Sequence, residues 1–132
     1  MLVELVKVAK SSSSPWLARV LTQFGEVAVR WCGEPAAKPG MYHVEWTVDE
    51  DIAWGQNAKP AAGVGPGVRP GGHCVVLLRG LLNLTADGAA VLDIDGTQIL
   101  LDLADPLPGS VAGTWVELFV EREKIALHPY EL

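Results

Sequence analysis

The second half of the chain repeats the hydrophobic pattern of the first half at an offset of about 72 residues. Leu2–Lys7 is echoed by Cys74–Arg79, and Val44–Asp49 is echoed by Val116–Glu121. Shorter echoes keep the same order along the chain: Ala18–Val20 with Ala90–Leu92, Glu34-Pro35 with Asp105-Pro106, and Ile52–Trp54 with Ile125–Leu127. An ordered repeat of this kind predicts two copies of one small β unit. We place the copies at residues 1–55 and 73–132, with a Gly/Pro-rich linker at residues 56–72.

The size of each copy predicts that the two copies support each other. The chain has 132 residues, of which 49% are hydrophobic, which is enough for a packed core. A unit of about 55 residues, however, buries too little surface to be very stable on its own. We therefore expect a shared interface that completes both cores.

Alternating apolar residues and turn signals predict five strands in each copy. The strands expected in the first copy are Leu2–Ala9, Trp16–Thr22, Glu26–Cys32, Met41–Val48 and a short Ile52–Trp54. Those expected in the second are Cys74–Thr85, Ala89–Ile94, Gln98–Leu103, Thr114–Glu121 and Ile125–Tyr130. Phe24-Gly25 and Asp95-Gly96 are tight hairpin signals, whereas Lys10–Pro15 and the linker, Gly55–Gly72, have loop composition.

Five short strands with a long first strand and a loop between the third and fourth resemble the oligonucleotide/oligosaccharide-binding (OB) barrel. The resemblance is strongest at Leu77–Gly80, Asp93–Gly96 and Trp115–Leu118, which fall where the first, second and fourth OB strands would lie. It implies an all-β fold of two tandem OB-like barrels with little or no helix. It also implies a binding face on the second and third strands, and it carries no catalytic residues.

Charge and cysteine content narrow the class of protein. The net charge is −6, and neither half has an excess of Lys and Arg over Asp and Glu, so no phosphate-binding footprint is visible. Such a balance favours basic partners. Cys32 and Cys74 stand in apolar runs and are expected to be buried free thiols. The charges at Glu4 and Lys7 argue against a signal peptide, and no apolar run reaches membrane-spanning length, so we expect a cytoplasmic protein without a membrane partner.

The most unusual local feature is a pair of aromatic residues among carboxylates on one face of a predicted strand. Strand alternation places Trp115, Glu117, Phe119 and Glu121 on the face opposite the core. His43 shares the corresponding face of the first copy with Glu45. Three interpretations stay open: a seal between the two copies, an interface with a homodimer mate or another protein, or a stacking platform for bases or sugars.

A second candidate surface carries tryptophans and cations. The chain has five tryptophans, and a nucleic-acid face would use Trp16 and Trp31 with Arg19, Arg30 and Arg79. Structural roles are the competing interpretation, because Trp31, Trp46 and Trp54 share faces with apolar neighbours. The acid-rich loops also disfavour nucleic acid.

No motif in the chain predicts an enzyme. Ser11–Ser14 lacks the setting of a nucleophile elbow, and the linker glycines lack the lysine of a phosphate-binding loop. The three histidines have no partner at a metal-ligand spacing, so we expect no metal and no cofactor. Three hypotheses for the function follow: an acidic protein-interaction module of inhibitor, immunity or adaptor type, a single-stranded nucleic-acid-binding protein, and a small-molecule or sugar-binding barrel.

Overall fold

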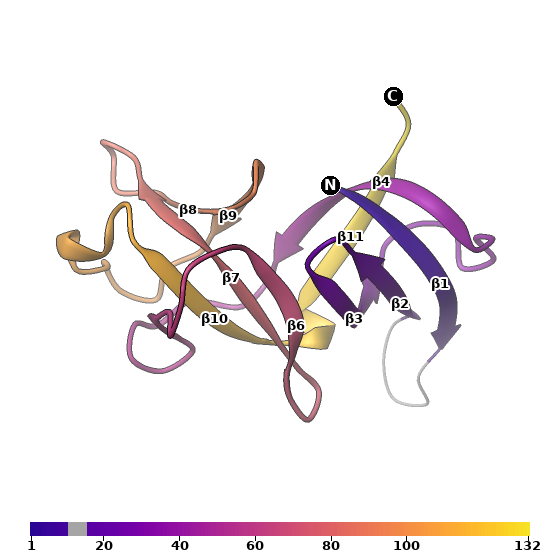
Figure 1. The fold of residues 1–132 in the computed structure, drawn as a ribbon, viewed down its shortest axis with the longest axis horizontal. Coiled ribbons are helices and arrows are strands. Elements are labelled where there is room, and N and C mark those ends of the chain that lie inside the picture. Colours follow the sequence, from indigo (N-terminus) through magenta and orange to yellow (C-terminus); the bar gives the residue numbers. More distant parts are fainter. Residues whose placement is uncertain (11–15) are drawn as a thin grey trace.

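The computed structural model describes residues 1–10 and 16–132, and the predicted loop Lys10–Pro15 lies largely outside the described residues. The described chain is all β, apart from two single 3₁₀ turns, η1 (Gly109–Val111) and η2 (Arg122–Lys124). Its strands form two sheets, one closed and one open (Figure 1). The predicted all-β fold is therefore confirmed.

Five strands close into a barrel in the order β1-β2-β3-β11-β4. Their bounds are β1 Leu2–Lys10, β2 Trp16–Thr22, β3 Gly25–Trp31, β4 Gly40–Val48 and β11 Ile125–Tyr130. All neighbours are antiparallel except β3 and β11, which run parallel. Each barrel strand pairs on both edges, so the barrel has no free edge.

The second sheet is open and has the order β5-β10-β7-β8-β9, with β6 also paired to β7. Its strands are β5 Ala58–Pro60, β6 Gly67–Gly72, β7 Val75–Leu84, β8 Ala90–Ile94, β9 Thr97–Leu101 and β10 Trp115–Glu121. The long β7 has β10 along one edge, while β6 and β8 share its other edge. Figure 1 shows this sheet beside the barrel, with the two ends of the chain both at the barrel.

Turn chemistry explains the hairpins. The Thr22 hydroxyl accepts the Phe24 N–H at 3.0 Å and donates to the Gly25 carbonyl at 2.9 Å, which fastens the β2–β3 turn. Asp95 and Gly96 both have positive φ, as a two-residue turn with right-handed strand twist requires. Both hairpins lie where the sequence predicted them.

The C-terminal strand belongs to the barrel, so the prediction that Ile125–Tyr130 completes the second copy is wrong. β11 pairs with β4 from Ile125 to Tyr130 and with β3 at Ala126 and Leu127. Ile125, Ala126 and Leu127 are fully buried there. η2 follows β10 directly and turns the chain toward the barrel, where the Asp49 N–H donates to the Lys124 carbonyl at 2.7 Å.

The expected linker is not a loop without structure. β5 pairs with β10 and β6 pairs with β7, because those two strands offer edges along which even Gly/Pro-rich backbone can bond. The predicted strand Ile52–Trp54 is reduced to isolated bridges, of which Ile52 pairs in parallel with Leu103 beyond β9. Residues 52–60 therefore pair with the second sheet, while the C-terminal strand pairs with the first.

The core is one continuous cluster that includes residues from both sheets. Trp31 and Trp46 are each 4% exposed within it, which confirms their structural role. Cys32, in contrast, is exposed, and Cys74 is half-buried with φ of 58°. The prediction of two buried thiols is wrong for Cys32, because Trp31 takes the inward position at the end of β3 and the next residue points outward.

Candidate functional site

The face of β10 that was expected to meet solvent is covered by the chain's own residues 58–72. Glu117 is 3% exposed and accepts two hydrogen bonds from Arg79, to Nε at 2.9 Å and to Nη2 at 2.5 Å. A Cβ on Gly63 would lie 3.7 Å from Arg79 Nη1, so the β5–β6 connection passes close to this guanidinium. The interpretation of Glu117 as an accessible binding residue is therefore wrong.

The two aromatic residues of this face are also partly covered. Trp115 and Phe119 are half-buried, and Lys59 of β5 lies 5.0 Å from the centre of the Phe119 ring. A Cβ on Gly71 of β6 would touch Phe119 at 3.3 Å. Glu121, at the end of β10, is exposed. Alternation correctly separated the two faces of β10, but it gave no signal of the segment that packs over one of them.

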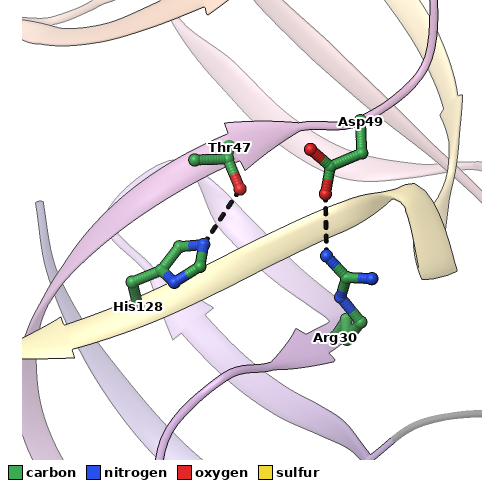
Figure 2. Close-up of polar contacts among 4 residues, drawn as sticks. All are labelled: Arg30, Thr47, Asp49 and His128. Atoms are coloured by element: carbon green, nitrogen blue, oxygen red, sulfur yellow. Dashed lines mark hydrogen bonds and ion pairs between the residues drawn. The ribbon is translucent and has the colours of Figure 1, made fainter.

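The arginines of the expected nucleic-acid face are all engaged by carboxylates. Arg19 pairs with Glu26 at 3.1 Å, and Arg79 pairs with Glu117 as described above. Arg30 pairs with Asp49 at 2.7 Å across the outer surface of the barrel, near the 3.0 Å contact of His128 with Thr47 (Figure 2). A cation paired in this way offers little net charge to a phosphate backbone.

The tryptophans of that face do not form a common platform. Trp31 is buried, donates from its Nε1 to the Glu34 carbonyl at 3.0 Å, and lies edge-on to Tyr42 with ring centres 5.5 Å apart. Trp16 is 37% exposed at the start of β2. One of the two tryptophans therefore lies in the core and the other at the surface.

His43 lies where the sequence placed it, on the outer face of the barrel, and four exposed large apolar side chains, Leu2, Leu21, Met41 and Tyr130, lie on the same face. We call this surface the barrel face; its members are Leu2, Glu4, Leu21, Met41, His43 and Tyr130. Register sets Glu4 opposite both Leu21 and Met41, and sets His43 opposite both Leu2 and Tyr130. Directly opposed side chains stand on the same side of a sheet, so these residues form two adjacent rows.

The barrel face is exposed despite its apolar content. Met41 is 59% exposed, Leu2 47%, Tyr130 42% and Leu21 39%. The rings of His43 and Tyr130 stack at 5.9 Å with a tilt of 40°. Single exposed apolar residues are ordinary, whereas a contiguous set with a polar rim is typical of an interaction site.

The turn between β8 and β9 overhangs this face and forms two adjoining grooves with it. One groove, of about 460 Å³, lies between the Leu2, Glu4, Leu21 and Met41 side of the barrel and the turn residues Asp95 and Thr97. The other, of about 420 Å³, lies between β4 and β9 and extends to Tyr130. Met1 and Thr97 line both, so the grooves meet.

The charge around the barrel face is acidic and unpaired. Glu4 stands at its centre, and Glu45 lies one position further along β4 on the same side. Among the described residues, neither carboxylate has an ion-pair partner within 4.0 Å. The sequence did carry a signal for this site, since Leu2 and Met41 are apolar at positions whose alternation directs them away from the core.

Three further observations concern the described residues. No group of three or more His, Cys, Asp or Glu side chains in residues 1–10 and 16–132 is arranged to hold a metal ion. The Thr85 hydroxyl donates a hydrogen bond to the Asp87 carboxylate, and this bond lowers the pKa of Asp87 below its ordinary value of 3.8. Asp87 is exposed in the β7–β8 turn, and no second acidic or basic side chain among the described residues is bonded to it. Within the same described ranges, no helix is long and apolar enough to cross a membrane.

Comparisons with known proteins provide no relative from which the site could be inferred. The chain matches no protein-family model, no curated protein and no solved structure.

Proposed function

We propose that this protein is a non-enzymatic binding module and that its barrel face meets a basic protein partner. The observation that carries the proposal is the row Leu21–Glu4–Met41, in which two exposed apolar side chains flank a carboxylate that has no ion-pair partner among the described residues. An apolar centre with charge at its rim is the usual composition of a protein interface. The net charge of −6 adds long-range attraction for a basic surface.

The same arrangement disfavours nucleic acid as the ligand. The exposed row has a glutamate at its centre, and Arg19, Arg30 and Arg79 are neutralised by Glu26, Asp49 and Glu117. A single-stranded ligand would need free cations along its backbone path. Anisotropy of a labelled DNA and RNA pool at low salt tests this alternative, and saturable, salt-sensitive binding would favour it over a protein partner.

We further propose that the two halves are OB-like copies whose fifth strands have been exchanged. In the barrel, β11 is parallel to the third strand and antiparallel to the fourth. In the second sheet, Ile52 is parallel to Leu103 after β9, and β5 is antiparallel to β10. The same relation in both halves supports a duplication. On this proposal, residues 1–55 and 73–132 are the two repeated units of the sequence, but they do not fold as two separate barrels.

The free thiols Cys32 and Cys74 support a reducing compartment such as the cytoplasm. A small-molecule or sugar ligand has weaker support, because the grooves beside the barrel face are open, whereas small-ligand pockets bury most of their ligand.

The test of the binding face is affinity capture from nuclease-treated lysate, followed by calorimetry with the purified partner. Met41→Lys and Leu21→Lys should each weaken binding at least about tenfold, because each replaces an apolar contact with a positive charge that repels a basic partner. Val64→Lys is the matched control, since Val64 is 79% exposed in the β5–β6 connection and is not a member of the barrel face. Equal binding by all three variants would contradict the proposed face.

A further inference from the structure

β9 lies at one end of the second sheet, and one of its edges is open. β9 pairs with β8 from Thr97 to Leu101 along one side. In the part of the chain that the structure describes, no strand pairs with the opposite side over these residues. Unpaired strand edges present rows of N–H and C=O groups that template the addition of another strand.

The backbone groups of Gln98 and Leu100 point to that open edge. The two-residue turn at Asp95-Gly96 makes Ile94 and Thr97 the first bonded pair of the hairpin, and bonded pairs then alternate with non-bonded pairs. Beyond the end of β9, the chain forms two hydrogen bonds on the side away from β8. The Asp102 carbonyl accepts the Ile52 N–H at 2.7 Å, and the Ala104 N–H donates to the Ile52 carbonyl at 3.0 Å. Gln98 and Leu100 have the same parity, so their backbone N–H and C=O groups face the side on which Ile52 bonds.

The open edge of β9 borders a groove. The groove of about 420 Å³ has β4 along one side, with Glu45 and Thr47, and β9 along the other, with Gln98 and Leu100. Leu100 is 65% exposed and gives the groove an apolar wall. Proteins commonly protect such an edge with lysine or proline, and β9, Thr-Gln-Ile-Leu-Leu, contains neither.

Charge decides between a second copy of this chain and a different partner. Asp93 and Asp95 precede β9 and Asp102 follows it, while Glu45 lies across the groove. Antiparallel pairing of two β9 edges would bring Asp95 of one copy toward Asp102 of the other. Repulsion between these carboxylates disfavours self-pairing, whereas a basic segment is attracted to all of them.

We propose that an extended, basic segment of the partner adds to β9 as a further strand, paired with Gln98 and Leu100. The inference rests on the proposed function and specifies how the partner is recognised: main-chain hydrogen bonds supply affinity, and alternate side chains meet Leu100 and the acidic rim. Within such a segment, alternate residues direct their N–H groups to β9, and the residues between them direct theirs away.

The test uses a defined probe, the capped peptide Lys-Val-Lys-Val-Lys-Val-Lys, titrated into the full ¹⁵N-labelled chain. Saturable shifts should be largest at the Gln98 and Leu100 amides, and both should gain protection from exchange. Two further peptides carry N-methyl groups on all valines or on all lysines. Strand addition requires that one of the two lose about tenfold or more in affinity while the other binds as the parent does, because only one set of N–H groups faces β9.

Variants of β9 test the same contact by changing the protein instead of the peptide. Leu100→Pro removes an N–H that points away from β8, so it should abolish peptide binding and leave the β8–β9 ladder intact. Leu100→Ala keeps that N–H and loses only the side-chain contact, so it should weaken peptide binding much less than Leu100→Pro does.

The outcomes separate the inference from the proposed function. Equal binding of both N-methylated peptides, or no saturable shift with the basic peptide at millimolar concentration, would overturn strand addition. Neither result bears on the barrel face, which is tested separately by Met41→Lys. Conversely, a Met41→Lys variant that keeps full partner affinity while Leu100→Pro loses it would support strand addition without the barrel face.

Discussion

The barrel and the second sheet have similar strands but different boundaries. Every barrel strand has two partners, and β11, the last strand of the chain, makes the closure. In the second sheet, β5 pairs with β10, and Ile52 forms a bridge with Leu103 beyond β9. Among the described residues, the barrel therefore has no free edge, whereas the second sheet has an open edge at β9. We propose that this open edge is the one that accepts a further strand.

Of the changes considered, removal of β11 should have the largest effect on the stability of the protein. A chain that ends at Lys124 loses the fully buried Ile125 and Leu127, each contributing roughly 1.5–3 kcal/mol, together with the strand pairs on both sides. Since domains of this size are stable by only about 5–15 kcal/mol, we expect no cooperative urea transition and no near-ultraviolet tryptophan signal. A chain that ends at Tyr130 is the control, because it loses only exposed residues. A native-like transition in the shorter chain would show that the barrel closes without β11.

The buried ion pair of the second sheet should rank next. Glu117→Gln leaves the Arg79 guanidinium, whose side chain is only 15% exposed, without its counter-charge. We expect a loss of about 3 kcal/mol in the free energy of unfolding, measured with urea. The double variant Arg79→Met/Glu117→Leu should recover most of this loss, because it leaves no unpaired charge. Failure of the double variant to recover would mean that the pair is needed for packing of the β5–β6 segment itself.

The contact between the two halves can be strained at a single glycine. Gly25 has φ of 142°, and a Cβ at this position would lie 2.0 Å from the Val68 carbonyl oxygen of β6. Gly25→Ala should cost about 2–3 kcal/mol, from the strained dihedral and the displacement of β6. Gly109→Ala has open space and no positive φ, so its thermal midpoint should match that of the parent chain. Equal midpoints for both variants would argue that β6 does not pack on the β2–β3 turn.

The smallest effect is expected at the surface pair of the barrel. Arg30 and Asp49 are bonded at 2.7 Å, but their side chains are 31% and 52% exposed. Asp49→Asn should therefore cost less than about 1 kcal/mol, and added salt should reduce the difference. This substitution is the counterpart of Glu117→Gln, and similar losses at the two sites would contradict the assignment of one pair as buried and the other as solvated.

The sequence was sufficient for most strands because they depend on local signals. Alternation of apolar residues and the turns at Phe24-Gly25 and Asp95-Gly96 predicted β1–β4 and β7–β10 within a few residues. The sequence pattern could not assign β11 to a sheet, since Ile125–Leu127 shows the same apolar pattern whichever sheet buries it. β5 and β6 were missed because their residues have poor strand propensity and pair only where β10 and β7 provide an edge.

The candidate site was predictable only in part for the same reason. Alternation placed His43 on the outer face of the barrel and Glu117 on the outer face of β10, and it was correct about both faces. It could not show that residues 58–72 cover Glu117, whereas Met41 and Leu21 stay exposed beside the β8–β9 turn. What lies over a sheet face is a property of the tertiary structure, and the row Leu21–Glu4–Met41 exists only because three strands come together in register.

The most direct measurement is residue-resolved amide hydrogen exchange of the free protein. If the barrel is closed and the β9 edge is open, the Leu127 amide should exchange only with global unfolding. The Gln98 and Leu100 amides should exchange orders of magnitude faster than their neighbours Ile99 and Leu101, which bond to β8. Strong and equal protection from residue 97 to residue 101 would mean that the edge is already paired, and the proposed route of partner recognition would be wrong.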